Sequence, residues 1–529
     1  MITENVIIKD WRKIDFSFGL IYPNKYKLAM SSYSIRLLYF LINNFKNIAC
    51  ERIFLPENVK LKFPASKDYS SKNIIRSLEN KILPNEFDIL GFSLHFENDF
   101  RNVLWILEKA EIPLTFKERH EIIREQETHF PLIIGGGPVV TSNPIPFSKF
   151  FDIMFIGDAE QNLKSFFKLY QVYKNKEIKF KDFLEQVRFI EGIFIPALEN
   201  KVKRYILGRL DDSPTPIFQL ISKTPRVESI FENNFFVEIN RGCPYQCKFC
   251  ISSFHNSPFR NRSYENIIKS IQESINYSHY ETISLIGSCV SSHPRFKQIC
   301  EYIISIGKRL TIPSIRIEHI TKDIIEVLER ADIKTITIAP EAGSEDLRFG
   351  LGKMISNEKI VTVLTQIKDS RIKNVKFYFL IGLPNEKEEN IDDIINLLKT
   401  LDSLGFDKNS LRVNINPFIP KLNTPYEKEI FYYLKDNMYE LVKKYQKLER
   451  ELKNLTTIKL KFKNFKVITK NARLQTIISL GNLQISDVIL YYYSNGATLG
   501  ALQKAEKDLD FYIDDYLLKI KQGYSPWIL

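Results

Sequence analysis

The sequence predicts an α/β protein with a doubly wound parallel sheet, then a partial (β/α)6 barrel, then a mainly helical C-terminal extension. The chain has 529 residues, more than one ordinary core accommodates. Short apolar strands alternate with helical patterns in two successive series, as parallel sheets covered by helices require. A segment without clear periodicity separates these series. We therefore expect domains at residues 1–206 and 233–424, a linker at 207–232 and an extension at 425–529.

The first series contains four short apolar strands separated by helical patterns. Two glycine turns follow strands of this series, Gly135-Gly136-Gly137-Pro138 and Gly157-Asp158-Ala159-Glu160. Ligands of open α/β sheets bind at the carboxyl ends of strands, where both turns are expected. The expected strands are Phe16–Tyr22, Asp88–Leu94, Leu132–Ile134 and Ile153–Ile156, and the expected helices are Tyr33–Phe45, Phe100–Ala110 and Glu160–Tyr173.

The second series predicts six strand–helix repeats, which suggests a partial barrel that is open on one side. In such barrels the functional residues lie on loops at the carboxyl ends of the strands. The expected strands are Phe235–Ile239, Thr282–Leu285, Ser314–Ile317, Thr335–Ala339, Val375–Ile381 and Arg412–Asn416. After Pro425 a helical pattern runs to Lys453, followed by a basic strand-like segment, Lys459–Lys470, and several short helices.

Composition limits the location and the partners of the protein. The first residues lack the apolar core of a signal peptide, and no run of about 18 apolar residues occurs, so we expect a cytoplasmic protein without a membrane span. The net charge is +12. A basic balance allows an acidic partner, such as RNA or an anionic lipid surface. Scattered surface lysines explain the same charge without any partner.

Three of the six cysteines fall within one short motif, which begins directly after the first expected barrel strand. Cys243, Cys247 and Cys250 have the spacing C-x3-C-x2-C. Thiolates are the usual ligands of iron–sulfur clusters, and three thiolates leave one iron open for chemistry. A structural zinc site is the alternative, and it needs a fourth ligand, for which His255 and Cys289 are the candidates.

The cysteine motif in this position resembles the signature of the radical S-adenosylmethionine (radical SAM) superfamily. The resemblance implies that Cys243, Cys247 and Cys250 are the catalytic cluster ligands and bind three irons of a [4Fe–4S] cluster. The fourth iron would chelate S-adenosylmethionine, and one electron would cleave it to methionine and a 5′-deoxyadenosyl radical. Phe249, between the last two cysteines, matches the aromatic residue that packs near the adenine in this family.

The same resemblance assigns further cofactor contacts to other strand ends. Gly287 and Ser288 would contact the methionine amino group, although the common Gly-Gly-Glu form is absent. Arg316 would neutralise the methionine carboxylate, or else form an ordinary ion pair. Glu341 would bind the ribose, with a helix N-cap as its alternative role. Gly382 would lie beside the adenine, or simply form a tight turn.

The N-terminal domain resembles the cobalamin (B12)-binding domain of one large subgroup of this superfamily, so cobalamin is a possible cofactor. The D-x-H-x-x-G loop whose histidine ligates cobalt is missing, since His95 lies in a different context. Some members bind cobalamin without that histidine. The alternative is a relic domain that serves substrate binding or partner contact.

These observations predict a radical SAM enzyme that modifies an unactivated carbon of an unidentified substrate, with cobalamin-dependent methylation as one form of the reaction. A ferredoxin or flavodoxin would donate the electron. The alternatives are an RNA- or lipid-modifying radical SAM enzyme without cobalamin, and a metal-stabilised binding protein without enzymatic activity.

Overall fold

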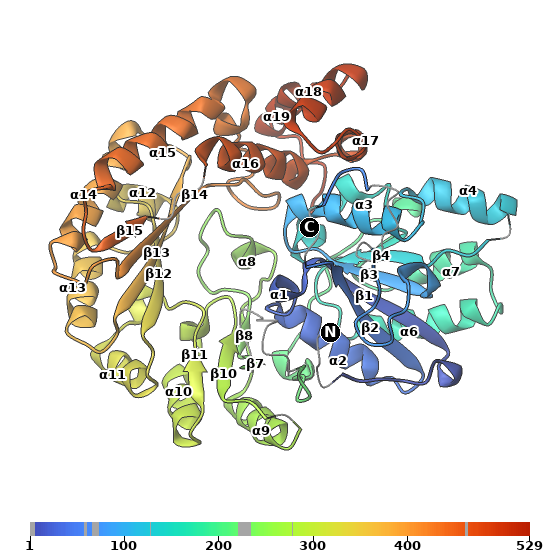
Figure 1. The fold of residues 1–529 in the computed structure, drawn as a ribbon, viewed down its shortest axis with the longest axis horizontal. Coiled ribbons are helices and arrows are strands. Elements are labelled where there is room, and N and C mark those ends of the chain that lie inside the picture. The colour runs from blue at the N-terminus through green and yellow to red at the C-terminus, as the bar shows by residue number, and fades with distance from the viewer. Residues whose placement is uncertain are drawn as a thin grey trace.

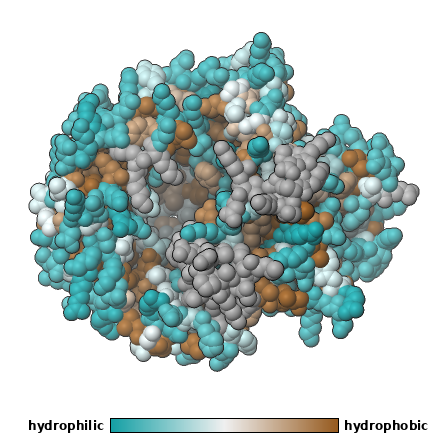
Figure 2. All heavy atoms as spheres, in the orientation of Figure 1, coloured by the Kyte–Doolittle hydropathy of each residue, from teal (hydrophilic) through white to brown (hydrophobic). Residues whose placement is uncertain are grey.

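The computed structural model describes residues 6–57, 61–65, 74–126, 128–220, 234–277, 279–460 and 464–529. Two α/β units lie side by side, and helices of the C-terminal extension cover the top of both (Figure 1). Most of the outer surface is hydrophilic, whereas hydrophobic residues are visible in the hollow inside the arc of the barrel (Figure 2). The predicted α/β class is confirmed.

The N-terminal unit is a six-stranded sheet with the order β2-β1-β3-β4-β5-β6. Strands β1 to β5 are parallel, and β6 is antiparallel to β5. One face packs against α2 and α6, and the other against α3, so the sheet is doubly wound. The strands are β1 (Phe16–Lys25), β2 (Ile48–Leu55), β3 (Ile89–Ser93), β4 (Leu132–Gly136), β5 (Ile153–Phe155) and β6 (Ile193–Phe194). The helices are α1 (Tyr26–Ala29), α2 (Tyr33–Asn43), α3 (Phe100–Lys109), α4 (Phe116–Gln126), α5 (Pro138–Ser142), α6 (Asn162–Lys174) and α7 (Phe180–Val187).

Strand β2 was not predicted, because charged residues interrupt its apolar run. The side chain of Arg52 is fully buried and forms an ion pair of 2.8 Å with Glu79, which is also fully buried. Glu51 accepts a hydrogen bond of 2.8 Å from the indole of Trp11. Distant partners therefore make this polar segment compatible with an interior strand.

The barrel sheet has two parts, β11-β10-β7 and β12-β13-β14-β15, and all of its strands are parallel. The helices lie outside the arc (Figure 1). The strands are β7 (Asn234–Glu238), β10 (Thr282–Ile286), β11 (Arg309–Thr311), β12 (Thr335–Glu341), β13 (Asn374–Ile381), β14 (Leu411–Pro417) and β15 (Ile458–Leu460). The helices are α9 (Tyr264–Ile275), α10 (Phe296–Ser305), α11 (Lys322–Arg330), α12 (Glu345–Gly350), α13 (Asn357–Lys368) and α14 (Glu388–Asp402).

The prediction of the third barrel strand at Ser314–Ile317 was wrong. The strand is β11, which ends at Thr311, and Ile317–His319 forms a 3-10 turn. Pro313 follows the strand closely and has no N–H group to donate to a neighbouring strand, so regular pairing ends there. The amide of Ile315 still donates to the carbonyl of Thr337 across the junction of the two parts, at 3.3 Å.

The C-terminal extension completes the barrel and then connects both units. Strand β15 pairs with β14, so the barrel sheet continues beyond residue 424. The predicted basic strand Lys459–Lys470 is mostly helical, since α16 begins at Phe465; residues 461–463 lie outside the described residues. The extension contains α15 (Met438–Leu452), α16 (Phe465–Leu480), α17 (Leu483–Ser494), α18 (Leu499–Asp508) and α19 (Ile513–Lys521).

The extension also contacts the N-terminal unit through polar groups. The side-chain amide of Asn98 donates to the carbonyl of Asn471 in α16, at 3.2 Å. The hydroxyl of Ser486 in α17 donates to the carbonyl of Pro146, at 2.8 Å. None of the described helices is long and apolar enough to cross a membrane.

The described part of the predicted linker, residues 207–220, is packed between the two units. Leu207, Leu210 and Leu220 are buried, and a carboxylate oxygen of Asp211 accepts from the amide of Ser263, at 2.9 Å. These contacts are specific but not periodic, which explains why the sequence pattern indicated a linker. Residues 221–232 of the predicted linker lie outside the described residues.

Candidate active site

The three cysteines lie on a loop that begins after β8 (Asn240–Arg241) and ends at α8 (Ile251–Phe254). Gly242 has a φ of +78°, and a Cβ there would lie 2.4 Å from the carbonyl oxygen of Asn256, so glycine is required. The amide of Cys250 donates to the carbonyl of Cys247, at 3.0 Å. We call residues 242–250 the cluster loop.

The cluster loop rests on the segment that follows α12. The amide of Lys248 donates to the carbonyl of Leu351, at 2.9 Å. Cys247 is buried, while Cys243 and Cys250 are partly exposed. Burial raises the pKa of Cys247, and the charges of Lys353 and Arg316 act against that shift. These two cations favour the thiolate form, which is the form that binds iron.

The arrangement of possible metal ligands bears on the choice between cluster and zinc. Among the described residues, no three His, Cys, Asp or Glu side chains converge as the ligands of a single metal ion would. A [4Fe–4S] cluster does not require such convergence, because each thiolate binds a different iron.

Of the two candidates for a fourth zinc ligand, His255 has a partner away from the cysteine motif, whereas Cys289 lies beside Cys243. His255 is buried, and its Nε2 donates to the carbonyl of Leu422 at 2.8 Å. Burial lowers its pKa to about 4, so the imidazole is neutral. The thiol of Cys289 lies close to that of Cys243 and 3.0 Å from the hydroxyl of Ser292.

Phe249 packs into a small apolar cluster at the carboxyl ends of the later barrel strands. Its buried members are Ala342, Leu351, Leu383 and Phe418. The structure therefore brings Phe249 to the residues that directly follow Glu341 and Gly382.

Glu341 ends β12 in a strained backbone conformation. Its φ is +71°, a left-handed value that costs a residue with a Cβ about 1–2 kcal/mol. Its carboxylate lies 2.9 Å from the ammonium of Lys353, which is buried. Strain of this kind is concentrated at functional sites. The N-cap alternative is wrong, because Ser344 caps α12 by accepting from the amide of Leu347.

Arg316 lies in the loop before the 3-10 turn, rather than on a strand as predicted, and stacks on the cluster loop. Its guanidinium is 3.5 Å from the ring centroid of Tyr245, and it pairs with Glu318. The hydroxyl of Tyr245 lies 2.7 Å from Nε2 of His319. Within the described part of the chain, Nε of Arg316 and Oε2 of Glu318 are buried without a partner. These two atoms are free to accept a partner from water or from a bound ligand.

Gly287 and Ser288 follow β10, and Gly287 lies against Asn240, two residues before the cluster loop. A Cβ on Gly287 would lie 2.1 Å from the side-chain oxygen of Asn240. The side-chain amide of Asn240 donates to the carbonyl of Cys289, at 2.8 Å. Gly382 has a φ of +76° and lies against Leu441 of α15, so packing also accounts for this glycine.

A cleft of about 390 Å³ separates the N-terminal unit from the mouth of the barrel. Its barrel side includes Gly287 and Ser288. Its other side includes Gly137 and Gly157, which also line a more apolar cavity above the N-terminal sheet. The two cavities therefore join the glycine turns of the first domain to the predicted cofactor contacts of the second.

Comparisons with known proteins identify the family. The family described as "Radical SAM proteins, N-terminal" matches residues 34–196, and "Radical SAM superfamily" matches residues 237–398. The chain belongs to the radical SAM superfamily. This radical SAM enzyme therefore uses a [4Fe–4S] cluster and S-adenosylmethionine, as the cysteine motif predicted.

Two relatives differ in how much of the chain they resemble. An uncharacterized protein of Methanocaldococcus jannaschii is 26% identical over 94% of this chain and 95% of its own. A tRNA-2-methylthio-N(6)-dimethylallyladenosine synthase of Staphylococcus aureus is 27% identical over 36% of this chain and 38% of its own.

Two solved structures share the fold of this radical SAM enzyme. The methyltransferase TsrM from Kitasatospora setae, solved with cobalamin and a [4Fe–4S] cluster, has a TM-score of 0.53 at 12% identity over 78% of this chain and 77% of its own. The cobalamin-dependent radical enzyme OxsB has a TM-score of 0.54 at 13% identity over 96% of this chain and 84% of its own. These likenesses establish the two-part architecture.

Several residues of the site were not predicted from the sequence. Lys353 belongs to no local motif, and its position beside Glu341 arises only in the folded chain. Tyr245 lies inside the cysteine motif but was not singled out, although an aromatic ring in a metal loop is a recognisable signal for a cation partner.

Proposed function

We propose that this radical SAM enzyme methylates an unactivated carbon with the help of cobalamin bound between its two units. Two adjoining cavities, which share Gly137 and Gly157 and extend to Gly287 and Ser288, carry this proposal. The apolar cavity, which we call the slot, holds about 80 Å³ and the cleft about 390 Å³, so a large cofactor would extend from the apolar cavity into the cleft, which reaches Arg241 beside the cluster loop. Of the two solved structures with this architecture, OxsB is named as cobalamin-dependent and TsrM was solved with cobalamin bound.

In this proposal Cys243, Cys247 and Cys250 hold the cluster, which supplies the electron that cleaves S-adenosylmethionine. The unpaired Nε of Arg316 would face the methionine carboxylate, and Gly287 and Ser288 would lie at the amino group. The carboxylate of Glu341, which pairs with Lys353, would bind the ribose hydroxyls. Phe249 and Gly382 would lie beside the adenine.

The residues of the slot fit cobalamin without a histidine ligand. Gly136 lines the slot and leaves space there, since a Cβ on it would meet no atom within 3.8 Å, whereas Gly91 and Gly135 pack against Phe18 and Phe151. Nε2 of His95 is within hydrogen-bonding distance of the hydroxyls of Ser34 and Ser93, at 3.0 and 3.1 Å. Burial lowers the pKa of His95 to about 4. Bound cobalamin would supply methyl-transfer chemistry, and we expect its cobalt to have no nitrogen ligand from His95.

Gly136 provides a selective test. A Cβ at Gly136 meets its nearest atom only at 3.8 Å, so alanine fits, whereas leucine would fill the slot. We expect Gly136→Leu to lose hydroxocobalamin binding and cobalamin-dependent S-adenosylhomocysteine formation, but to keep 5′-deoxyadenosine formation. Gly136→Ala is the matched control and should keep all three.

The binding of hydroxocobalamin is measured anaerobically by its visible spectrum, and both nucleoside products by chromatography. Wild-type protein that binds no hydroxocobalamin, or that forms S-adenosylhomocysteine equally well without it, would refute the methylation proposal. A ferredoxin or flavodoxin of the cytoplasm is the proposed electron donor.

A second candidate is an RNA-modifying radical enzyme without cobalamin. Two observations favour it, the partial similarity to a tRNA-modifying synthase and the net charge of +12. Incubation with S-adenosylmethionine, dithionite and total tRNA tests it by mass spectrometry of the nucleosides. A new modified nucleoside formed without cobalamin would support this candidate against the first. A lipid substrate would be tested in the same way with extracted lipids.

A further inference from the structure

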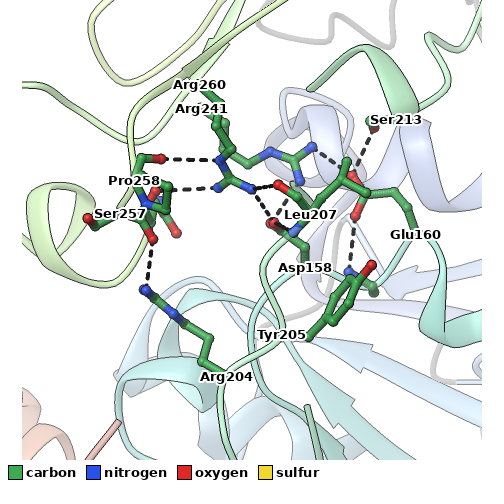
Figure 3. A network of polar contacts seen from close by, with 12 residues as sticks. Asp158, Glu160, Arg204, Tyr205, Leu207, Ser213, Arg241, Ser257, Pro258 and Arg260 are labelled. Carbon is green, nitrogen blue, oxygen red and sulfur yellow. Dashed lines mark hydrogen bonds and ion pairs between the residues drawn. The ribbon is translucent and has the colours of Figure 1, made fainter. Parts of the chain in front are cut away.

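A largely buried network of charges joins the N-terminal unit to the start of the cluster loop (Figure 3). Asp158 bridges two arginines of the barrel, with one carboxylate oxygen 2.7 Å from Arg241 and the other 2.7 Å from Arg260. Glu160 lies 2.7 Å from the other terminal nitrogen of Arg241. Both carboxylates belong to the turn that follows β5.

The guanidinium of Arg241 is held from three sides. Glu238, on the barrel strand β7, accepts from its Nε and from its Nη2, each at 2.9 Å. With Asp158 on Nη1 and Glu160 on Nη2, all three nitrogens are used. A lysine cannot reproduce this arrangement, because its single ammonium lacks the planar fork. Burial alone would raise the pKa of Asp158, but the charges of Arg241 and Arg260 hold it below its usual value.

Arg241 is two residues from Cys243, so its position fixes where the cluster loop starts. The N-terminal unit also holds the segment that follows the cluster loop, at the end of α8. The guanidinium of Arg204 donates to the carbonyls of Phe254 and Ser257, at 3.0 and 2.8 Å. Figure 3 shows Arg204 reaching Ser257 on the opposite side of the network from Glu160. The barrel therefore does not position its cluster loop alone.

We propose that Asp158 and Glu160 are positioning residues for the cluster loop, and that the N-terminal unit thereby completes the S-adenosylmethionine-cleaving site of the barrel. Both side chains also line the cleft between the units, together with Arg241. A ligand in that cleft contacts the same carboxylates that position the loop. Occupancy of the cleft is in this way coupled to the geometry of the cluster.

The test compares Asp158→Asn and Glu160→Gln, alone and together, with the wild type after anaerobic reconstitution. Each substitution keeps the shape and removes one charge that holds Arg241. We expect the double variant to bind a cluster, but to lose the change in its electron paramagnetic resonance (EPR) spectrum on addition of S-adenosylmethionine. Because a misplacement of about 1 Å can cost ~100-fold in rate, we expect 5′-deoxyadenosine formation to fall at least about tenfold. Arg241→Lys should behave in the same way.

Glu97→Gln is the matched control. Glu97 is also a buried carboxylate between the two units, where it pairs with Lys421 and accepts from Gln475 at 2.8 Å. It does not contact the network around Arg241. This variant should lose stability and keep the wild-type EPR response to S-adenosylmethionine.

The proposal is overturned if Asp158→Asn and Glu160→Gln respond to S-adenosylmethionine and form 5′-deoxyadenosine as the control does. Should the double variant not fold, the single variants decide, since each leaves Arg241 with two carboxylates. Neither the EPR response nor 5′-deoxyadenosine formation requires cobalamin. A negative result here therefore leaves the methylation proposal standing, and failure of the methylation proposal leaves the positioning role of Asp158 and Glu160 standing.

Discussion

Replacing Glu341 by glutamine separates a role in cofactor binding from a role in stability. The carboxylate pairs with Lys353 at 2.9 Å, and both side chains are mostly buried, 12% and 9% exposed. Glu341→Gln keeps the length of the side chain and removes its charge. In the free enzyme the change leaves the ammonium of Lys353 without its counter-charge.

Two magnitudes follow from these contacts. Removing one partner of a buried pair costs about 3–5 kcal/mol, and the residual exposure of this pair lowers our expectation to about 1–3 kcal/mol of stability. A hydrogen bond to a charged group contributes about 1.5–3 kcal/mol. Loss of such a bond to the ribose would therefore weaken S-adenosylmethionine binding about 10- to 100-fold.

Anaerobic titration calorimetry with the oxidised cluster measures this affinity without turnover, and thermal unfolding measures stability. Lys353→Met removes the same ion pair but leaves the carboxylate, so we expect it to weaken S-adenosylmethionine binding much less. If Glu341→Gln unfolds at a lower temperature but binds S-adenosylmethionine as tightly as the wild type, Glu341 is only the partner of Lys353 and the assigned role is wrong.

Three further predictions concern glycines and a buried carboxyl. Gly287→Ala would place a Cβ 2.1 Å from the side-chain oxygen of Asn240. We therefore expect this variant to lose about 1–3 kcal/mol of stability and to bind S-adenosylmethionine more weakly. An affinity for S-adenosylmethionine equal to that of the wild type would contradict this prediction. Gly343→Ala would place a Cβ 2.1 Å from a backbone nitrogen of α14, which cannot move away, so we expect little soluble protein. Gly350→Ala is the control, because its Cβ meets no described atom within 4 Å, and it should express normally. Burial raises the pKa of Asp99 to about 6. The folded protein then binds more protons than the unfolded chain between pH ~4 and ~6, so stability falls as the pH rises through this window, by about 1–3 kcal/mol. Asp99→Asn should therefore raise the unfolding temperature more at pH 7.5 than at pH 5. An equal rise in unfolding temperature at both pH values would refute the raised pKa of Asp99.

The part of the fold that the sequence predicted consists of segments whose apolar pattern is local. Most strands of both units are continuous apolar runs, and their positions were predicted closely. Strand β2 was missed because Glu51 and Arg52 are polar in the sequence and are buried only with distant partners. The third barrel strand was misplaced because the apolar alternation continues past Pro313, where pairing stops.

In the candidate site, too, some residues are indicated by a local sequence pattern and others are brought together only by the fold. Cys243 to Cys250 lie within eight residues, so their spacing alone indicates the chemistry. The pairing of Asp158 with Arg241 joins residues 83 positions apart, and no local pattern encodes it. Arg316 was expected on a strand, yet the loop that carries it still brings its guanidinium to Tyr245.

The central claim is that Cys243, Cys247 and Cys250 hold a cluster that cleaves S-adenosylmethionine. Anaerobic reconstitution with iron and sulfide tests this claim most directly. We expect the wild type to be brown, to hold about four irons per chain, and to form 5′-deoxyadenosine with dithionite and S-adenosylmethionine. Cys250→Ala should form none. A colourless wild type with tightly bound zinc and no 5′-deoxyadenosine would contradict the cluster assignment and favour a metal-stabilised binding protein.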